Sequence, residues 1–228
     1  MNSIAERFFG ETAEALAEAS EPPALRAVQA KAHSRLDILF SETLEHSSAQ
    51  VACKRGCWYC CYLKVDVWPS EVFLMADYVR KHFSSDDVEA VKRVASENWG
   101  KIEPMNLDEH WSANLPCPFL KAGACSIYAA RPGSCRGFHA QRVSTCEESY
   151  QKPTDLNSPN SVVPAVRMAT DSALAGVKAA YAAANFDCQP YDLNPAILAA
   201  LESGKAERRW RDKKSAFPKE MRAKQPAE

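Results

Sequence analysis

Apolar residues recur at the spacing of α-helices along most of the chain, whereas the alternating pattern of β-strands is rare. The helical spacing, bounded by proline, serine or glycine, predicts helices over residues 3–19, 25–45, 69–79, 84–99, 162–184 and 196–202. Residues 100–115 and 147–161 lack this period and contain proline, so they are expected to be loops. The pattern predicts a mainly α protein, a single helical domain with irregular loops.

Composition and charge are those of a globular protein without a strongly basic body. The 228 residues are enough for a sizeable core, and the hydrophobic fraction of 46% is ordinary for a folded domain. The formal net charge is −1, so nucleic acid is not an expected partner. Residues 205–228 carry nine Lys or Arg against four Asp or Glu, which leaves −6 for the preceding body (−1 minus +5). This basic tail is expected to be disordered, with partner binding as the alternative.

The sequence shows no signal for export or membrane insertion. The N-terminal residues contain neither a basic segment nor an apolar run of the length found in secretion signals. No run of 18 apolar residues predicts a membrane span. The expected location is the cytoplasm, where thiols stay reduced, and nine cysteines is an odd number for a disulfide framework. Metal or cluster ligation is therefore favoured over disulfides.

Four cysteines fall within nine residues: Cys53, Cys57, Cys60 and Cys61. A helix would place their thiols on one stripe. A turn at Gly56 would instead make a C-x-x-C knuckle of the kind that binds zinc or part of an iron–sulfur cluster. Neighbouring side chains on a helix diverge by about 100°. Cys60 and Cys61 are therefore expected to serve different metals, or one of them to support the ligands of the first.

A second group of cysteines is spread over a longer region: Cys117, Cys125, Cys135 and Cys146. Seven, nine and ten residues separate them, which is too wide for a local knuckle. They can meet only if the loops between them fold back, and prolines and glycines supply turns for such a path. This spacing predicts a site assembled by the tertiary structure.

The two groups together carry a resemblance. The pattern C-x3-C-x2-C-C, followed by C-P-F-L-x4-C-S-I-Y-x2-R-P-x2-C-R, resembles the YkgJ-like CxxCxxCC cysteine-cluster family, a zinc- or iron-chelating domain, over about residues 53–146. The resemblance implies that the metal ligands are Cys53, Cys57, Cys60, Cys61, Cys117, Cys125, Cys135 and Cys146. It does not include Cys188. Some relatives resemble flagellin lysine N-methylases, but the chain has no glycine-rich loop for S-adenosylmethionine, so that activity is not carried over.

Ligation by sulfur alone suits zinc or an iron–sulfur cluster and argues against magnesium, calcium or manganese. The long loops around Cys125 and Cys135 and the vicinal pair favour the cluster slightly over zinc. Either centre carries negative charge and would attract cations close in sequence to the ligands. These are Lys54, Arg55, Arg131, Arg136 and Arg142.

Three functions follow from these observations. The first is metal binding, of zinc or an iron–sulfur cluster, with a structural or redox role. The alternatives are a cluster-containing enzyme, either lysine methyltransferase-like or an oxidoreductase, and a thiol–disulfide redox switch or interaction module. No catalytic residue is assigned. His139 could be a further ligand, but packing is its expected role, and Cys188 is expected to be an inert thiol.

The same features divide the chain into four segments. They are an N-terminal helical pair (1–48), the cysteine-cluster domain (49–146), C-terminal helices that pack on the same core (147–204), and the basic tail (205–228).

Overall fold

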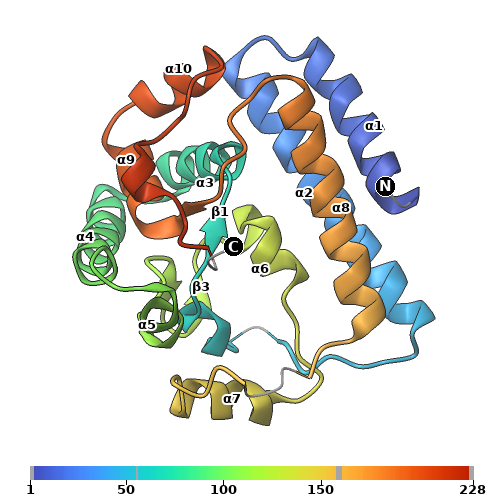
Figure 1. Ribbon diagram of the computed structural model, residues 1–228, viewed down its shortest axis with the longest axis vertical. Coiled ribbons are helices and arrows are strands. Elements are labelled where there is room, and N and C mark those ends of the chain that lie inside the picture. Colours follow the sequence, from blue (N-terminus) through green and yellow to red (C-terminus); the bar gives the residue numbers. More distant parts are fainter. Residues whose placement is uncertain (1–2, 55, 158–160, 226–228) are drawn as a thin grey trace.

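The computed structural model describes residues 3–54, 56–157 and 161–225 (Figure 1). It is a single mainly-α domain, 64% helical with only very short strands, which confirms the predicted fold class. The α-helices are α1 (Ser3–Glu18), α2 (Pro22–His46), α3 (Pro69–His82), α4 (Ser85–Ile102), α5 (Leu107–Ser112), α6 (Gly133–Gly137), α7 (Val143–Gln151), α8 (Pro164–Ala183), α9 (Leu193–Glu202) and α10 (Lys205–Arg211). The other elements are the 3₁₀ helices η1 (Tyr59–Tyr62), η2 (Tyr128–Ala130) and η3 (Lys219–Met221), and the strands β1 (Asp66–Val67), β2 (Leu120–Lys121), β3 (Ala124–Cys125) and β4 (Tyr191–Asp192).

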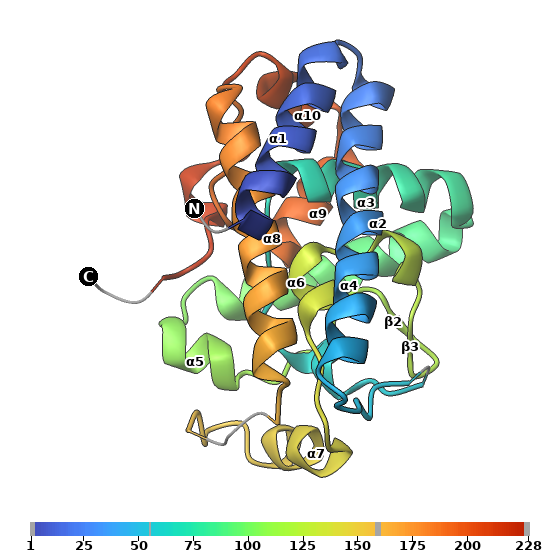
Figure 2. The same cartoon turned by 90° about the vertical axis from the view of Figure 1, so that its right-hand side faces the viewer.

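The long helices form two packed groups that share one core. Helices α1, α2 and α8 lie on one side of the molecule, and α3, α4 and α9 lie on the other (Figure 1). Side chains from both groups are almost fully buried in the same apolar cluster, among them Phe8, Leu36, Met75, Val177 and Ile197. Helix α7, which carries Cys146, is the outermost helix at one end of this body, and α6, which carries Cys135, lies nearer its centre (Figure 2).

Small residues let α8 lie unusually close to α1. Ala173, Gly176 and Ala180 are buried along α8. A Cβ atom on Gly176 would be 2.2 Å from the carbonyl oxygen of Ala5. The alanine-rich composition of this helix is therefore a packing requirement of the α1–α8 contact.

The strands form two short antiparallel pairs. One pair joins segments that are distant in sequence, and the other is a hairpin. Strands β1 and β4 pair Val67 with Tyr191 and join the end of the first cysteine group to α9. Strands β2 and β3 form a hairpin in which Leu120 faces Cys125. The hairpin turn has φ of 49° at Ala122 and 73° at Gly123, the left-handed conformation of the favoured two-residue turns.

Two predicted loops contain helices. Helix α5 lies within residues 100–115, and its start is fixed by mutual hydrogen bonds between Asn106 and Glu109, with Glu109 N–H to Asn106 Oδ1 at 2.9 Å. Helix α7 extends to Gln151, into the predicted loop 147–161. Helices this short contain too few apolar positions to show a period, so the prediction of unbroken loops was wrong there.

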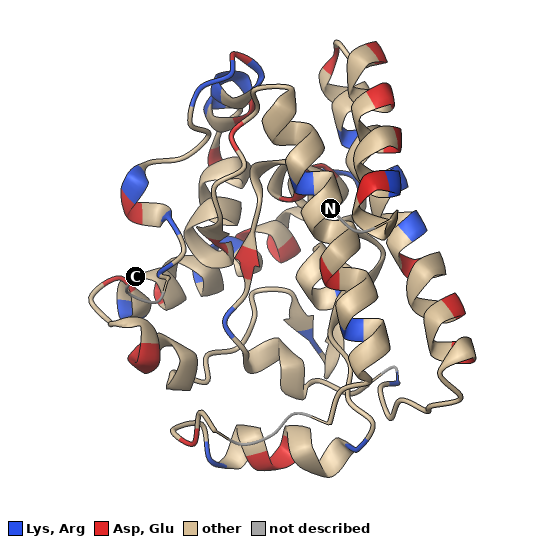
Figure 3. Ribbon diagram, turned by 45° about the vertical axis from the view of Figure 1, so that its right-hand side comes forward, with Lys and Arg blue, Asp and Glu red and all other residues tan. Residues whose placement is uncertain are grey.

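Residues 205–225 fold against the body, in contrast to the expected disordered tail. Trp210 of α10 and the following Phe217 are each 2% exposed. The indole N–H of Trp210 donates to the carbonyl oxygen of Asp187 at 3.1 Å. The basic side chains of α10 gather at one end of the molecule, opposite α7 (Figure 3). No helix in the described part of the chain is long and apolar enough to cross a membrane.

Candidate metal centre

The first cysteine group begins in a turn and ends in η1. Gly56 has φ of 88°, and the N–H of Cys57 donates to the carbonyl oxygen of Lys54 at 3.0 Å. Among the described residues of this region, 51–54 and 56–63, only Tyr59–Tyr62 is helical. The interpretation with a turn at Gly56 is therefore correct, and the single helix with four thiols on one stripe is wrong. Arg55 lies outside the described residues.

The hairpin β2–β3 brings Cys117 and Cys125 towards the first group. The N–H of Cys117 donates to the carbonyl oxygen of Cys61 at 2.7 Å, which ties the two cysteine groups together through the backbone. The thiols of Cys117 and Cys125 each have a backbone hydrogen bond two residues on, from Phe119 and Ile127. A backbone N–H that faces sulfur favours the thiolate, the form that binds metal.

Helix α6 places Cys135, and a buried carboxylate anchors the start of that helix. The Gly133 N–H donates to Glu71 Oε1 at 2.7 Å, and Glu71 is 3% exposed. A Cβ atom on Gly133 would lie 2.3 Å from Leu174 Cδ2, so only glycine fits without moving this leucine. The sequence analysis assigned no such role to Glu71, because its partner is 62 residues away.

Arg136 links the loop that precedes α6 to helix α2. It is 7% exposed, pairs with Asp37 of α2, and its Nε donates to the carbonyl oxygen of Arg131 at 2.9 Å. Arg131 lies 3.5 Å from Asp37 and stacks on the ring of Tyr128 at 3.8 Å. The contacts of Arg136 therefore give it mainly a structural role, holding this loop against α2.

The eight cysteines of the two groups lie close enough to interact electrostatically. Cys146 interacts with Cys53, Cys57 and Cys60. Cys117 interacts with Cys135, Cys125 and Cys60. The thiol of Cys60 is also hydrogen-bonded to that of Cys61. The chain therefore gathers thiols from segments up to 93 residues apart (Cys53 to Cys146) in one region.

Cys188 has different surroundings. Its thiol donates to the carbonyl oxygen of Phe186 at 3.4 Å and is near Lys178. Its thiol interacts electrostatically with Asp187 and Lys178, neither of which is one of the eight cysteines.

The described thiols lie near one another, but they are not arranged as ligands around a common point. Within the described residues, no three His, Cys, Asp or Glu side chains are arranged to hold a metal ion. All nine cysteines are free thiols. Cysteine side chains have three staggered χ1 positions, so rotation can redirect a sulfur without moving the backbone. The donor set consists of sulfur, which fits zinc or an iron–sulfur cluster in its chemistry.

Comparison with known families supports this chemistry. Residues 52–159 match the CxxCxxCC family. Its family model is described as "Putative zinc- or iron-chelating domain". The match confirms the resemblance carried by the two cysteine groups and extends it by 13 residues beyond Cys146, from 146 to 159. No curated protein and no solved structure matched the chain.

Burial raises the pKa of several of the gathered thiols, those of Cys53, Cys60, Cys117, Cys125, Cys135 and Cys146. The hydrogen bond with Cys61, followed by burial, raises the pKa of Cys60 far above its ordinary value. Burial raises the pKa of Cys135 to about 12 and that of Cys146 to about 11. The positive charge of Arg131 opposes this effect at Cys60 and Cys125. A metal that binds here must displace protons, so binding should strengthen as pH rises.

An aromatic cluster joins α7 to the first cysteine group. Trp58 and Tyr62 meet Tyr150 of α7, with ring centroids 5.0 and 4.9 Å apart. Tyr59 stacks beside Trp58 at 4.6 Å. Two of these rings, Tyr59 and Tyr150, line a small pocket together with Cys60 and Cys146, and Cys146 also lies on α7.

His139 has a structural role, as expected. It is 1% exposed, its Nδ1–H donates to the carbonyl oxygen of Gly137 at 3.0 Å, and its Nε2 accepts from the N–H of Val163 at 2.8 Å. Both ring nitrogens are occupied, so neither faces the thiols. This ring links the end of α6 to the start of α8.

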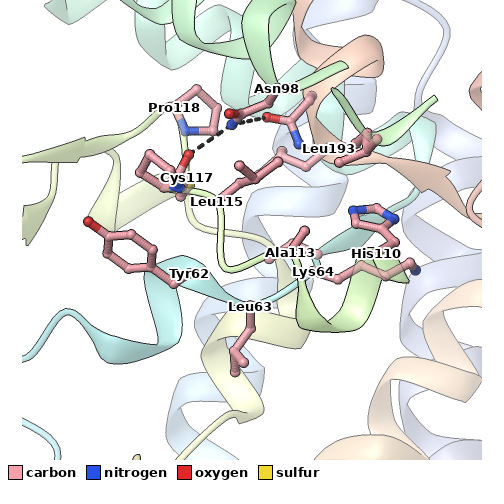
Figure 4. Close-up of a pocket in the computed structure, with 14 residues that line it drawn as sticks. Tyr62, Leu63, Lys64, Asn98, His110, Ala113, Leu115, Cys117, Pro118 and Leu193 are labelled. Carbon is pink, nitrogen blue, oxygen red and sulfur yellow. Dashed lines mark hydrogen bonds between the residues drawn. The ribbon is translucent and has the colours of Figure 1, made fainter. Parts of the chain in front are cut away.

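A polar pocket lies on the other side of Cys117 (Figure 4). It opens between η1, the end of α4, α5 and the start of α9, and its wall includes Lys64, His110 and Cys117. Asn98 also lines this pocket, and its side-chain amide donates to the carbonyl oxygen of Pro116 at 2.8 Å and to Asn194 Oδ1 at 3.0 Å. The free space in this pocket is about 20 Å³, which is enough for a water molecule but not for a substrate.

His110 and Asp192 form a buried pair behind this pocket. Their Nε2 and Oδ2 atoms are 3.4 Å apart, and Asp192 Oδ2 has no hydrogen-bond partner among the described residues. Burial raises the pKa of Asp192 to about 6. Burial and the charges of Lys64 and Lys224 lower the pKa of His110 to about 4. Between pH 4 and 6, the folded pair therefore holds its proton on Asp192, whereas the unfolded chain holds it on the histidine.

Single substitutions in this pair should expose two opposite pH dependences. With His110→Gln, the folded state alone binds a proton, at Asp192, so the free energy of unfolding should fall as pH rises from about 4 to 6. With Asp192→Asn, the unfolded state alone binds a proton, at His110. The free energy of unfolding should therefore rise with pH over about pH 4 to 6.5. Each change should be on the order of 2 kcal/mol in urea unfolding. Slopes of the same sign in the two variants would contradict this assignment.

Proposed function

We propose that this protein is a metal-binding protein in which the CxxCxxCC segment holds zinc or an iron–sulfur cluster, in a structural or redox role. The ligands in this proposal are Cys53, Cys57, Cys60, Cys61, Cys117, Cys125, Cys135 and Cys146. The observation that supports it is that these eight thiols, from segments distant in sequence, lie close enough to interact electrostatically, whereas Cys188 lies apart from them. The printed description of the matching family supports the same chemistry.

An iron–sulfur cluster is our first choice of occupant. Five short structural units present the thiols: the turn before η1, η1 itself, the β2–β3 hairpin, α6 and α7. Such a dispersed set resembles the enclosure of a cluster more than two compact zinc knuckles. When bound, a cluster would supply electron transfer or sensing, and zinc would supply folding energy. The surrounding thiols need a reducing compartment, so we propose the cytoplasm.

One observation favours a second candidate, a cluster-containing enzyme. The pocket beside Cys117 offers His110, held near Asp192, as a group that could exchange a proton with a bound water molecule. A methyltransferase-like or oxidoreductase activity would require a substrate there. A third candidate, the redox switch, predicts disulfides among thiols that are all free in this structure.

Metal analysis separates these functions. The protein should be purified without oxygen, and its zinc, iron and acid-labile sulfide should be measured per chain together with a visible spectrum. We expect stoichiometric iron and sulfide with a brown colour. Colourless protein with bound zinc would exclude the cluster and keep metal binding. Protein that retains neither metal, and whose thiols titrate as disulfides, would contradict the proposal and support the redox switch.

A further inference from the structure

Acidic side chains line the outer face of α1 where this helix ends. Glu14 and Glu18 are exposed and one helical turn apart, and Glu21 is exposed in the link to α2. Among the described residues, none of these three carboxylates has an ion pair or a hydrogen-bond donor, whereas Glu11 of the same helix pairs with Arg35. Carboxylates four residues apart on a helix repel each other. We call Glu14, Glu18 and Glu21 the acidic stripe.

Basic side chains line the outer face of α10. Lys205, Arg208 and Arg211 are exposed and recur every third residue, while Ala206 and Trp210 on the opposite face are buried. Within the described part of the chain, the three cationic groups have no carboxylate partner. Because Trp210 holds the helix against the body, these charges stay together at one place on the surface. We call Lys205, Arg208 and Arg211 the basic stripe.

The two stripes lie side by side at one end of the molecule. An ion pair between Arg26 and Glu207 joins the start of α2 to α10, and the acidic stripe ends directly before α2. Figure 1 and Figure 2 show α10 beside the linked ends of α1 and α2. Figure 3 shows basic residues on α10 and acidic residues on α1 at this end. A surface with neighbouring regions of opposite charge is complementary to itself after rotation about a twofold axis.

We propose that this end of the fold is a self-association surface, where the acidic stripe of one copy contacts the basic stripe of a second copy and the reverse contact forms about the twofold axis. The two stripes have similar lengths, since four residues of α1 rise about 6 Å and six residues of α10 rise about 9 Å. This association does not depend on the proposed metal binding.

The chemistry of the surface favours a second copy over other partners. None of the described large apolar side chains that are exposed belongs to α1 or α10, so the surface offers no side chain for insertion into a membrane. A nucleic acid attracted by the basic stripe would be repelled by the acidic stripe beside it. A second copy presents both charges in the required places. Exposed ion pairs stabilise little and are screened by salt, so the dimer is weak and salt-sensitive.

Sedimentation of the full-length protein at two salt concentrations tests the surface. A reductant is present throughout, so that the free thiols do not form disulfides between chains. With protein at about 200 µM, dimers should form in about 20 mM salt and should dissociate in about 500 mM salt, where charges are screened beyond about 4 Å. Monomer in low salt would overturn the proposal, and so would a dimer that persists in high salt.

Charge reversal tests which side chains meet. Glu14→Lys/Glu18→Lys gives a chain with two positive surfaces, and Arg208→Glu/Arg211→Glu gives a chain with two negative surfaces. Each variant alone should remain monomeric in low salt, because like charges then face each other. An equal mixture should form heterodimers, because each surface again meets the opposite charge, and their formation also shows that both variants are folded. A mixture that stays monomeric, or a variant that still dimerises alone, would contradict the assigned contact.

A matched control changes the same charge elsewhere. Glu42 and Glu45 are exposed near the other end of α2, and Glu42→Lys/Glu45→Lys alters the net charge as much as Glu14→Lys/Glu18→Lys does. This control variant should still form dimers in low salt. Its dissociation to monomer would show that net charge, and not the acidic stripe, governs association, which would overturn the proposal.

Discussion

Replacing Cys57 by serine should lower the stability of the metal-loaded protein far more than replacing Cys188. Cys57 is one of the eight gathered thiols, and loss of a ligand removes metal-linked folding energy, on the order of 3–6 kcal/mol. Since 1 kcal/mol shifts the melting temperature of a domain of this size by about 2–4 °C, the loss should reach on the order of 10 °C. Cys188→Ser changes only weak thiol hydrogen bonds to the carbonyl oxygens of Phe186 and Lys178 and should cost about 1 kcal/mol.

Thermal unfolding followed by circular dichroism provides the measurement. The same pair of variants should be compared again after extraction of metal by a chelator. The difference between them should then shrink, because the ligand role of Cys57 no longer contributes. Equal melting temperatures in the loaded proteins would contradict a ligand role for Cys57. A difference that persists unchanged after extraction would assign it to packing.

Replacing Gly176 by alanine should produce the second large effect. The added Cβ would lie 2.2 Å from the carbonyl oxygen of Ala5 and 3.1 Å from its Cα atom. The obstacle is backbone, which cannot rotate away as a side chain can, so α1 must shift off α8. We expect a loss of about 3 kcal/mol in the free energy of unfolding, larger than the gain in helix propensity of about 1 kcal/mol.

A matched control is available on the facing helix. Gly10 lies within α1, and a Cβ atom there would meet nothing within 4 Å. Gly10→Ala should therefore stabilise the protein by about 0.5–1 kcal/mol through helix propensity alone. Urea unfolding of both variants measures the two effects. A neutral or stabilising Gly176→Ala would show that the α1–α8 contact can relax, and that close approach is not the reason for this glycine.

The long helices could be predicted because their signal is local. The apolar period of residues 3–19 predicted α1 to within one residue at its end, and the period over 162–184 predicted α8 to within two. Pro22 and Pro23 were interpreted as a break before the second helix, but they occupy the first turn of α2, where a missing N–H costs nothing. Short helices such as α5 were not predicted, because they have too few buried side chains to produce a recognisable apolar period.

The basic residues after 204 show where composition misleads. Charge density predicts a solvated tail, yet Trp210 and Phe217 are enough to hold the segment against Phe73, with ring centroids 5.4 and 5.8 Å away. Two aromatic side chains bury as much apolar surface as a longer stretch of smaller residues. A charged α10 can therefore be ordered by its uncharged positions.

The sequence by itself determined the mainly α class and the match of residues 52–159 to the family model, because helix period and cysteine spacing are both properties of residue order along the chain. Only the tertiary structure decided which thiols are neighbours, that a turn rather than a helix carries Cys57, and that both nitrogens of His139 are occupied. It also decided that Glu71 anchors the helix of Cys135 from 62 residues away. These contacts depend on packing between distant segments. The number of residues between two positions does not show how far apart they are in the folded protein.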